Sequence, residues 1–579
     1  MATPATPAIA RTAGPLGGLR FEGSGPPGAA DGLVADHLRL LGARPAGGSG
    51  GTITVAGGGL GEVTVRTTWG EAAMDEATVQ AVTGIMAVHG RRDGAPRGLA
   101  VDYAATAAGV LAVQGLLAGL LARARGGTGV TGVEVTAERA GLLAVSQYLA
   151  AAGAEEGEAA ELVPGGPPFT TADGVVFELE ALDPGVWAAF WRALDAPEEA
   201  MRRGWRPFQF RYATACAPFP ESLHEVARVG TWARVRNAAL LSGADVCRLR
   251  SLAERAAECD DAPPWEFSPR DAAYTGRPAT GALPLSGFTV LEAGRRIQAP
   301  LAARLLGLLG ARVIRIEPPG GDPLRGMPPA CSGVSARWLA LNRGKDAVEV
   351  DIKNPSERER LRELAVDADV FLHNWAPGKA AELGLDHEHL AAVNPALVYA
   401  YTSGWAGRLP DAPLGTDFMV QARTGAGEAV RPADEAPFPS LMTLLDVLGG
   451  LLGAEAITAG LLSRERTGHG VRVDSSLLGA ADVLTAPARA RAARGLGPRR
   501  PPGFRRPLST ADGWIAVTDD TVMPYEVSEL TTRQALERLR ADGPAAVPVV
   551  TDLAGLLDSP GVSRDAHGAP AVPTPWSFA

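Results

Sequence analysis

The sequence predicts an α/β fold made of two related copies fused in one chain. Residues 76–125 align without a gap to residues 417–466, and 16 of the 50 aligned pairs are identical. A repeat of this length indicates a duplicated domain rather than a solenoid unit. After residue 284, strand-like and helix-like segments alternate, the pattern of a parallel sheet covered by helices on both faces. We therefore expect a parallel-sheet large domain, with a small domain following it in each copy.

The identical pairs of the repeat fall into clusters. Shared Ala, Gly and Leu are expected from composition alone, but a VQA-x-TG motif followed at the same distance by Asp-x-Ala-Pro is not. The clusters are VQA-x-TG (79–84 and 420–425), Asp-x-Ala-Pro (from Asp93 and from Asp434) and AGLL-x-R-x-R (118–125 and 459–466). Duplication explains these matches better than biased composition.

Stretches rich in Pro, Gly, Ala and Thr divide the chain. We expect a disordered tail over 1–16, an N-terminal copy over 17–257, a linker over 258–283 and a C-terminal copy over 284–579. The C-terminal copy divides into a large domain, 284–500, and a small domain, 501–579.

The C-terminal copy shows the clearest alternation of elements. In chain order the predicted strands are GFTVLEA (287–293), RVIRIE (312–317), DAVEVDIK (346–353), DVFLHN (369–374) and LVYAYTSG (397–404), and the predicted helices are 300–311, 356–368, 380–393, 440–465 and 474–494. Ligands of such sheets bind beyond the carboxyl ends of the strands. Here those ends are followed by PPGGDPLRG, NWAPG and SGWAG.

The N-terminal copy is shorter than the C-terminal copy. DHLRLLGARP (36–45) matches RLLGLLGARV (304–313) at an offset of 268, whereas the later repeat has an offset of 341, so about 73 residues are absent between the two matches. This copy has therefore lost most of its βαβ front. It keeps the helical body and a small domain, in which FTTADGVVFELE matches LSTADGWIAV. The run GGGLGE (57–62) is better explained as a hairpin turn than as a dinucleotide-binding loop, because a strand-like segment follows it.

Composition narrows the function. The formal net charge of −10 argues against a nucleic-acid or anionic-membrane binder, because phosphate binding requires concentrated Lys and Arg. The four cysteines show no metal-binding spacing, and no metal is expected. Residues 104–122 are long and apolar enough to span a membrane, but the repeat partner contains Asp446 and Glu455, so we interpret both as buried helices. No signal peptide is visible, and we expect a cytoplasmic protein.

A series of segments in the C-terminal copy carries a family resemblance. They are VLEAGRRIQAPLAARLLGLLGARVIRIEPPGGDPLR, LNRGKDAVEVDIKNPSERERLREL, ADVFLHNWAPG, NPALVYAYTSGW, TDFMVQARTG, RERTGHGVRVDSSLL, TADGWIAV and AVPVVTDLAGLLDSP. In this order and spacing they resemble the family III CoA transferases of the CaiB/BaiF type, which include formyl-CoA transferase-like enzymes and α-methylacyl-CoA racemases. The N-terminal copy resembles the family from VQAVTG onward.

The resemblance implies transfer of CoA from an acyl-CoA to a carboxylic acid. An aspartate attacks the thioester and becomes an acyl-aspartyl anhydride. The position that matches the nucleophile is Asp434, with Asp93 as its counterpart in the N-terminal copy. Asp417, matched by Glu76, corresponds to the carboxylate of the racemases. His387 and His389 fall where a racemase histidine is expected, although a surface helix explains them better.

The resemblance also implies a CoA site. The matching positions are Arg325, Arg343, Lys345, Val350, Asp351, Lys353, Asn374, Trp375 and Gly404. Two positions depart from the family, since Pro318 and Glu382 stand where transferases often carry CoA-contacting arginines. Arg296, Arg312 or Arg315 could compensate; otherwise the ligand differs from free CoA, for example a carrier-protein thioester.

Family members are homodimers, so the duplication implies an intramolecular pseudo-dimer, with further association of chains left open. A CoA transferase is the favoured function, with acyl-CoA and a small carboxylic acid as the expected partners. An acyl-CoA racemase that exchanges the α-proton is the runner-up. A repurposed, non-catalytic homologue that binds acyl-thioesters is the third alternative.

Overall fold

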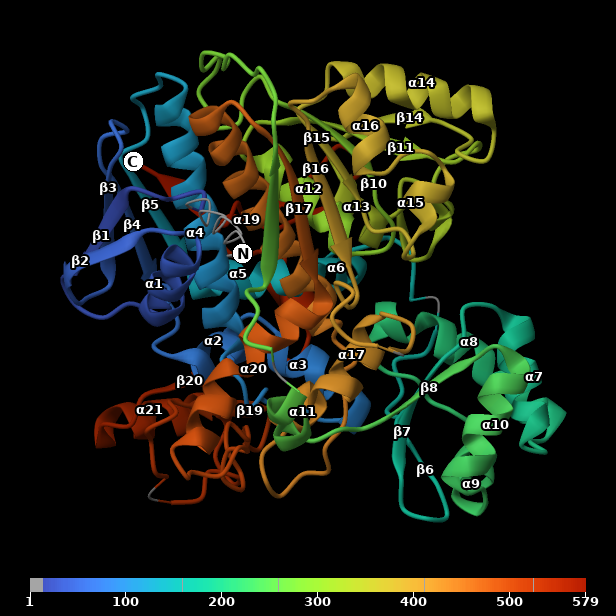
Figure 1. Cartoon of the computed structure of the whole chain (residues 1–579). Coiled ribbons are helices and arrows are strands. Elements are labelled where there is room, and N and C mark those ends of the chain that lie inside the picture. Colours follow the sequence, from blue (N-terminus) through green and yellow to red (C-terminus); the bar gives the residue numbers. More distant parts are fainter. Residues whose placement is uncertain (1–13, 159, 259, 411, 524) are drawn as a thin grey trace, which may run out of the picture.

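The structure is a computed structural model that describes residues 14–158, 160–258, 260–410, 412–523 and 525–579. Most of the predicted tail, residues 1–13, therefore lies outside the described residues. Two sheets stand side by side with long helices between them, and two small domains lie below them in Figure 1.

The sheet of the C-terminal copy contains every strand predicted for it. Its order is β14-β11-β10-β15-β16-β17-β9, and all neighbours run parallel except β9, which is antiparallel to β17. The bounds are β9 Trp265–Arg270, β10 Thr289–Ala293, β11 Arg312–Glu317, β14 Asp346–Glu349, β15 Val370–His373, β16 Val398–Ser403 and β17 Gly470–Ser476. β9 lies within the segment expected to be a linker, 258–283, so part of that segment belongs to this sheet.

Helices cover both faces of this sheet, as the alternation predicted. On one face, Val290 and Val370 pack with α12 (Gln298–Leu308) and α19 (Leu444–Thr467). On the other face, Leu291 and Phe371 pack with α14 (Pro355–Val366) and α16 (His387–Val393). Successive residues of a strand point to opposite faces, so both faces of each central strand are buried.

The sheet of the N-terminal copy keeps the strand order of the other copy without most of its helices. Its order is β2-β1-β3-β4-β5-β23, with β2, β1, β3, β4 and β5 in the places of β11, β10, β15, β16 and β17. The bounds are β1 Leu19–Ser24, α1 Asp31–Leu40, β2 Arg44–Gly48, β3 Thr52–Gly57, β4 Val63–Thr68, β5 Gly132–Thr136 and β23 Trp576–Phe578. The expected loss of the βαβ front is visible here: a crossover with helices α15 (Lys379–Glu382) and α16 joins β15 to β16 in the C-terminal copy, whereas a short hairpin turn joins β3 to β4 in the N-terminal copy.

The direction of β3 follows from the short connections on either side of it. A parallel neighbour needs a crossover of a dozen or more residues, and only residues 49–51 and 58–62 flank this strand. β3 accordingly runs antiparallel to both β1 and β4, and GGGLGE forms the hairpin turn that the sequence predicts. Side chains along β3 and β4 alternate between buried and more exposed positions, because no counterpart of α14 or α16 covers the outer face.

The two longest helices form the centre of the molecule. α4 (Tyr103–Ala124) and α19 are long and apolar enough to span a membrane, and 100% and 94% of their apolar windows are buried within the protein. They pack against each other, and the Tyr103 hydroxyl donates to the Leu444 carbonyl at 3.0 Å. Tyr103 and Leu444 are equivalent positions of the repeat, so a pseudo-two-fold axis passes close to this bond. Glu455 accepts a hydrogen bond from His37 across the copies, at 2.9 Å, which explains an acid inside this core.

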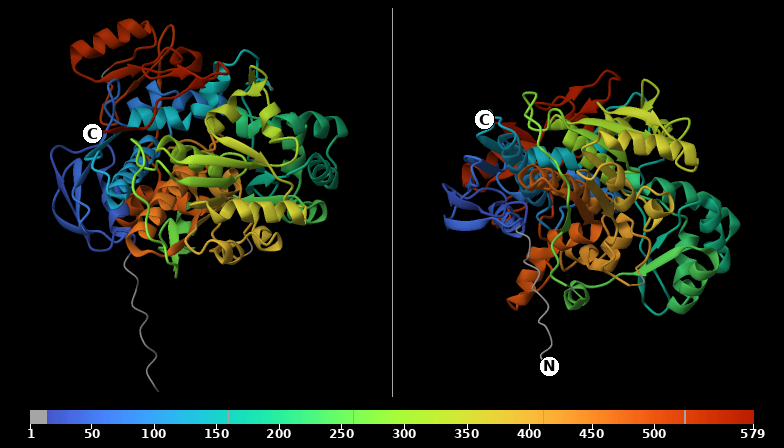
Figure 2. Two further views of the ribbon diagram at one scale, coloured as in Figure 1. Left: turned by 90° about the horizontal axis from the view of Figure 1, so that it is seen from above. Right: turned by 45° about the horizontal axis from the view of Figure 1, so that its top comes forward.

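Each small domain packs on the other copy. The N-terminal small domain lies against α17 (Asp417–Thr424), and the C-terminal small domain lies against α2 (Glu76–Val82). The equivalent carbonyls of Ala81 and Ala422 accept hydrogen bonds from Val550 and Arg250, at 3.0 and 2.8 Å. Two strands are likewise exchanged: β9, which follows the N-terminal copy, is an edge strand of the C-terminal sheet, and β23, at the end of the C-terminal copy, is an edge strand of the N-terminal sheet. The copies therefore interlock as the predicted pseudo-dimer, with their small domains apart from one another (Figure 2).

The remaining elements complete the helical body and the two small domains. In the N-terminal copy they are α3 Ile85–Gly90, η1 Arg91–Asp93, α5 Ala137–Ala144, α6 Ser146–Ala152, β6 Phe169–Thr170, β7 Val176–Glu180, α7 Pro184–Ala193, α8 Glu198–Thr214, α9 Glu221–Val229, α10 Trp232–Ser242, β8 Asp245–Arg248 and α11 Leu252–Glu258. In the C-terminal copy they are η2 Pro323–Gly326, β12 Ala330–Cys331, β13 Val334–Ser335, α13 Ala336–Asn342, α15 Lys379–Glu382, α18 Ala426–Ala429, α20 Leu477–Ala493, β18 Leu508–Ser509, β19 Trp514–Val517, α21 Thr532–Asp542, β20 Ala546–Pro548, η3 Leu553–Leu556, β21 Ser563–Arg564 and β22 Pro570–Ala571.

The exchanged strand β23 provides a test of the interlock. Trp576 is 4% exposed, and its indole N–H donates to the Leu111 carbonyl of α4 at 2.7 Å. We expect Trp576→Ala to lower the free energy of unfolding by about 3–5 kcal/mol, because it removes a large buried ring together with its hydrogen bond to α4. Thermal unfolding measures the loss. Ser577→Ala, an exposed change on the same strand, is the control and should alter stability by less than about 1 kcal/mol.

Candidate active site

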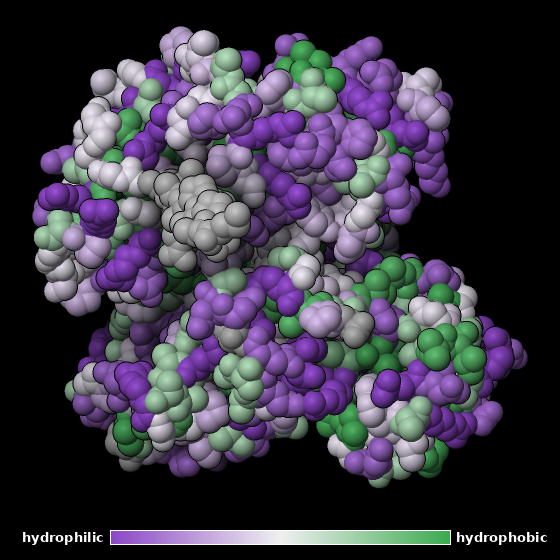
Figure 3. Space-filling model, in the orientation of Figure 1, coloured by the Kyte–Doolittle hydropathy of each residue, from purple (hydrophilic) through white to green (hydrophobic). Residues whose placement is uncertain are grey.

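A cavity of about 550 Å³ opens where the N-terminal small domain faces the strand ends of the other copy. One wall is α8. The opposite walls are the loop after β10, with Arg296, the loop after β11, and α13, with Trp338. Figure 3 shows a notch between the lobe of α7–α10 and the rest of the molecule, with hydrophobic residues on that lobe. The cavity thus needs both copies.

Asp446 presents a carboxylate to this cavity from the first turn of α19. Its side chain makes no hydrogen bond to the described residues, although the residue is only 9% exposed. Burial raises the pKa of Asp446 well above its ordinary value of 3.8, the nearby Asp417 raises it further, and the guanidinium of Arg296 opposes the rise. A buried carboxylate without a partner is costly to retain, which is typical of a functional group.

Asp417 and Gln421 hold the start of α19 in place. The backbone N–H of Asp446 donates to Asp417 at 2.7 Å, and the Gln421 amide donates to Asp417 at 2.5 Å. The side-chain amide of Gln421 also accepts from the Ser440 N–H at 2.8 Å and donates to the Ser440 carbonyl at 2.9 Å. Asp417 is fully buried and lies beneath the cavity rather than in it. It therefore positions Asp446 by capping the helix.

The N-terminal copy repeats this clamp around a second cavity of about 960 Å³. Glu76 accepts from the backbone N–H groups of Ala104 and Ala105, each at 2.8 Å, and from Gln80 at 2.9 Å. Ala105 is the repeat equivalent of Asp446, so this cavity lacks the corresponding carboxylate.

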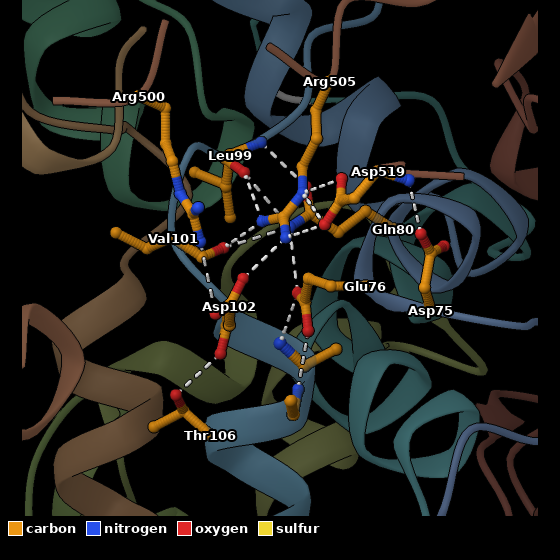
Figure 4. Close-up of polar contacts among 12 residues, drawn as sticks. Asp75, Glu76, Gln80, Leu99, Val101, Asp102, Thr106, Arg500, Arg505 and Asp519 are labelled. Atoms are coloured by element: carbon orange, nitrogen blue, oxygen red, sulfur yellow. Dashed lines mark hydrogen bonds and ion pairs between the residues drawn. The ribbon is translucent and has the colours of Figure 1, made fainter. Parts of the chain in front are cut away.

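An arginine from the opposite small domain occupies the second site (Figure 4). Arg505 is buried, and its guanidinium donates to the Leu99 and Val101 carbonyls at 3.1 and 2.9 Å and to Asp102 at 2.6 Å. It also donates to Asp519 at 2.8 Å. Its hydrogen-bonding capacity is filled by the protein itself, so the pseudo-equivalent sites differ chemically.

The structure places the sequence candidates Asp434 and Asp93 outside the 550 Å³ cavity. Asp434 lies on a loop with its side chain 29% exposed, where Gly503 N–H donates to it at 3.0 Å and Arg506 forms an ion pair. Partial burial raises the pKa of Asp434, but these two donors outweigh that effect and lower it below 3.8. Asp93 pairs with Arg431 at 2.8 Å and with Arg92 at 3.5 Å. Their roles as nucleophiles stay predictions from sequence.

Three of the predicted CoA-binding cations are bonded within the protein. Arg325 pairs with Glu317 at 2.8 Å, and its guanidinium lies 3.8 Å from the Trp338 ring centroid. Lys345 is buried and donates to Glu292, to the Pro300 carbonyl and to Asn342, each at 2.8 Å. Burial lowers the pKa of Lys345 to about 8.

Arg343 is the third of these cations. It donates to the Pro570 carbonyl at 2.6 Å and pairs with Asp565 at 3.3 Å. It thereby attaches the C-terminal segment to the end of α13.

The other predicted positions follow the carboxyl ends of parallel strands, as the sequence suggested. Lys353 is exposed after β14, and its ammonium group makes no hydrogen bond to the described residues. Asn374, after β15, bonds both the N–H and the carbonyl of Arg295, at 2.8 and 2.9 Å. Trp375 is buried at 8% exposure. Gly404 follows β16 where a Cβ would come within 2.4 Å of the Gly415 backbone.

Val350 and Asp351, the remaining two positions, shape the turn after β14. The N–H of Val350 donates to the Glu317 carbonyl at 2.8 Å, and Asp351 accepts from the Lys353 N–H at 3.0 Å. They shape the turn that carries Lys353, and neither residue lines the cavity.

Of the possible compensating arginines, Arg296 alone lines the cavity among the described residues. Arg312 pairs with Asp346, and Arg315 is buried between Glu292 and Asp322. Arg296 has a left-handed backbone with φ of 60°, which costs a residue with a side chain about 1–2 kcal/mol. Such strain is commonly retained where a side chain must point into a site.

The two candidate histidines lie on α16, away from the cavity. Asp386 caps the helix by accepting from the His389 N–H at 3.0 Å, the His389 ring contacts the same carboxylate at 2.6 Å, and His387 packs edge-on against Tyr399 at 5.6 Å. These contacts agree with the surface-helix interpretation.

A family model decides the identity of this arrangement. The model described as CoA-transferase family III matches residues 61–259 and, separately, residues 285–544. This chain belongs to CoA-transferase family III. The two matches confirm the tandem arrangement of a CaiB/BaiF-type fold.

Named CoA transferases resemble about a third of the chain. A mouse succinyl-CoA:glutarate CoA-transferase is 36% identical over 211 residues, which cover 35% of this chain and 48% of the relative. An acetyl-CoA:oxalate CoA-transferase from Acetobacter aceti is 36% identical over 204 residues, covering 34% of this chain and 52% of the relative. The chain thus spans about half the length of the curated relatives it matches.

One solved structure of the family resembles about half of the chain. A CAIB/BAIF family protein from Brucella suis is 27% identical, with a TM-score of 0.46, and the match covers 51% of this chain and 93% of that protein.

The sequence interpretation missed Asp446 as a site residue. The available signal was an acidic residue in the first turn of a largely apolar helix, where a buried charge is costly unless it is paired or functional. The repeat supplied a second signal, because Asp446 aligns with Ala105 and so distinguishes the two copies of this family III chain.

The clamp predicts how the Asp446 carboxyl titrates. Asp417→Asn removes a neighbouring negative charge, so we expect the pKa of Asp446 to fall toward its ordinary value. Carboxyl ¹³C chemical shifts measured against pH, assigned through Asp446→Asn, report this pKa. Glu76→Gln changes the equivalent residue at the other clamp and is the matched control; an equal shift in both variants would contradict the assignment.

Proposed function

We propose that this chain transfers CoA between an acyl-CoA thioester and a carboxylic acid, with Asp446 as the nucleophile. The observation that carries the proposal is the unbonded, buried carboxylate of Asp446 in a cavity beyond the strand ends of a family III CoA-transferase fold. The names of the relatives support the reaction class. Asp434 and Asp93 remain the alternative nucleophiles from sequence, and Asp417 remains the predicted counterpart of the racemase carboxylate.

The reaction requires two acyl transfers to and from one carboxylate. Asp446 attacks the thioester carbonyl carbon, the C–S bond breaks, and CoA leaves as a thiolate, which produces an acyl-aspartyl anhydride. The thiolate then attacks the aspartyl carbonyl and releases the first carboxylate, leaving an aspartyl-CoA thioester. The acceptor carboxylate repeats these steps in reverse and regenerates Asp446. Arg296 supplies a positive charge near the carbonyl oxygen as negative charge develops.

Geometry favours Asp446 over the two alternatives. A nucleophile must reach a substrate carbonyl, and Asp446 opens onto a cavity whereas Asp434 and Asp93 are each held by arginine side chains. Ala105 cannot perform this chemistry in the second cavity, so we propose one catalytic site per chain. The CoA phosphates would lie beyond the strand ends, where the side chains of Arg295 and Lys353 are exposed.

The cavity favours transfer over racemisation. Exchange of an α-proton on two faces requires a second acid–base group opposite the carboxylate. No histidine is among the described residues that line the cavity. Glu180, the other carboxylate there, is bonded to Arg211, Tyr212 and Thr416.

Substitution of the candidate nucleophiles tests the assignment. We expect Asp446→Asn to lower CoA exchange at least ~10³-fold, because an amide cannot form the anhydride, and Asp434→Ala and Asp93→Ala to retain most activity. Hydroxylamine trapping during turnover, followed by peptide mass spectrometry, should locate a single hydroxamate per chain at Asp446. A hydroxamate at Asp434 or Asp93 would transfer the role to that residue. Absence of acyl-CoA binding in calorimetry would favour the non-catalytic alternative.

The pH dependence tests the state of Asp446. Because burial raises the pKa of this carboxyl, it is neutral at low pH and becomes a nucleophile only as the pH rises through that pKa. We therefore expect kcat/KM for acyl-CoA to increase with pH, with an apparent pKa well above the ordinary carboxyl value of about 4. A profile that is flat from pH 5 to pH 9 would contradict this assignment.

A further inference from the structure

The charged groups that line the 550 Å³ cavity are mostly paired with one another or with neighbours. The buried Arg211 bonds Glu180 at 3.1 Å, and the buried Arg337 bonds Glu158 at 2.6 Å. Among the described lining residues this leaves one cation without a carboxylate partner, Arg296, and one carboxylate without a hydrogen bond, Asp446.

The loop after β10 holds Arg296 over the cavity. Asn374 bonds both backbone groups of the preceding residue, Arg295. The Arg296 guanidinium carbon lies 5.3 Å from the centroid of the Tyr212 ring. Arg296 is near enough to Asp446 to affect the pKa of that carboxyl. A substrate carboxylate bound to Arg296 would therefore lie close to the nucleophile, and a whole pantetheine arm away from the CoA phosphates.

The rest of the lining is largely apolar and includes aromatic rings supplied by the other copy. The side chains available for contact are Leu182, Trp205, Phe210, Tyr212, Leu324 and Met327. Of these, Trp205, Phe210 and Tyr212 belong to α8 of the N-terminal small domain and are half-buried. Ligand sites usually combine such an apolar wall with a few polar groups that orient the ligand.

We infer that the acyl group of the donor and the acceptor both come from apolar monocarboxylic acids, with the thioester carbonyl of the donor or the carboxylate of the acceptor at Arg296 and the hydrocarbon body against the α8 wall. This inference rests on the proposed function and specifies its substrate class. A dicarboxylic acid would carry a second charge into the apolar wall, where no unpaired cation is available among the described residues. A buried charge without a partner is strongly disfavoured. Selectivity then arises from rejection of the second carboxylate.

A pair of thioesters with six-carbon acyl groups tests this inference. Hexanoyl-CoA and adipyl-CoA differ by one terminal carboxylate. Exchange of labelled free CoA into each thioester reports the first half-reaction without any acceptor acid. We expect kcat/KM for hexanoyl-CoA to exceed that for adipyl-CoA at least ~100-fold. Titration of both thioesters into Asp446→Asn measures the same preference as binding, without turnover.

Substitutions in the α8 wall and at Arg296 test which side chains cause the preference between the two thioesters. Phe210→Arg adds a cation to the wall and should improve adipyl-CoA exchange roughly tenfold relative to hexanoyl-CoA. Leu240→Arg adds the same charge at a site on this lobe that is 82% exposed, and it should leave the ratio unchanged. Arg296→Gln should raise KM for the acceptor acid more than it slows the first half-reaction, and Arg296→Lys should partly restore that KM.

The outcomes separate the two proposals. Exchange that depends on Asp446 but favours adipyl-CoA would overturn the substrate class and leave the transferase function standing. No exchange with either thioester would overturn the function, and binding to Asp446→Asn would still decide the substrate class. An equal effect of Leu240→Arg and Phe210→Arg would overturn the role of the α8 wall.

Discussion

The architecture depends on the mutual burial of α4 and α19. Each helix is largely apolar around its circumference, so neither has a broad polar face that suits water, and each must be covered on every side. The sheet of its own copy covers one side only, and the equivalent helix of the other copy covers much of the rest. The bond from Tyr103 to Leu444, two equivalent positions, marks the pseudo-two-fold axis. Because this packing brings each small domain over the other copy, the cavity at Asp446 exists only in the paired arrangement.

The two copies around this core differ in the side chains that line their cavities. Both keep an acid and a glutamine that clamp the first turn of the long helix, Asp417 with Gln421 and Glu76 with Gln80. In both copies the acid accepts hydrogen bonds from backbone N–H groups at the start of the long helix. The copies differ at a residue that this clamp holds in the first turn of the long helix, which is Asp446 in α19 and Ala105 in α4. The copy that lost its βαβ front is also the copy without the cavity carboxylate, which agrees with one catalytic site per chain.

Local patterns in the sequence predicted much of the fold. RVIRIE is β11 at the predicted bounds, the other strands of the C-terminal copy agree within a few residues, and GGGLGE is a hairpin turn. The shortened front was visible as a change of offset between the copies. The places of β9 and β23 were not visible, because an edge strand is chosen by the sheet it completes, and each completes the sheet of the other copy. The antiparallel direction of β3 could be derived only after the structure had shown which strands lie beside it.

By itself, the sequence determined the duplication, the alternation of elements, the resemblance to a family and the strand ends at which a ligand site forms. These properties depend on periodicity and on neighbours along the chain. Only the tertiary structure decided which charges face the cavity. Arg325 and Lys345 match the family pattern yet pair with Glu317 and Glu292, whereas Asp446 was inconspicuous in the sequence and has no partner. The physical reason is that a charge is available to a ligand only when folding leaves it unpaired, and its partners come from segments remote in sequence.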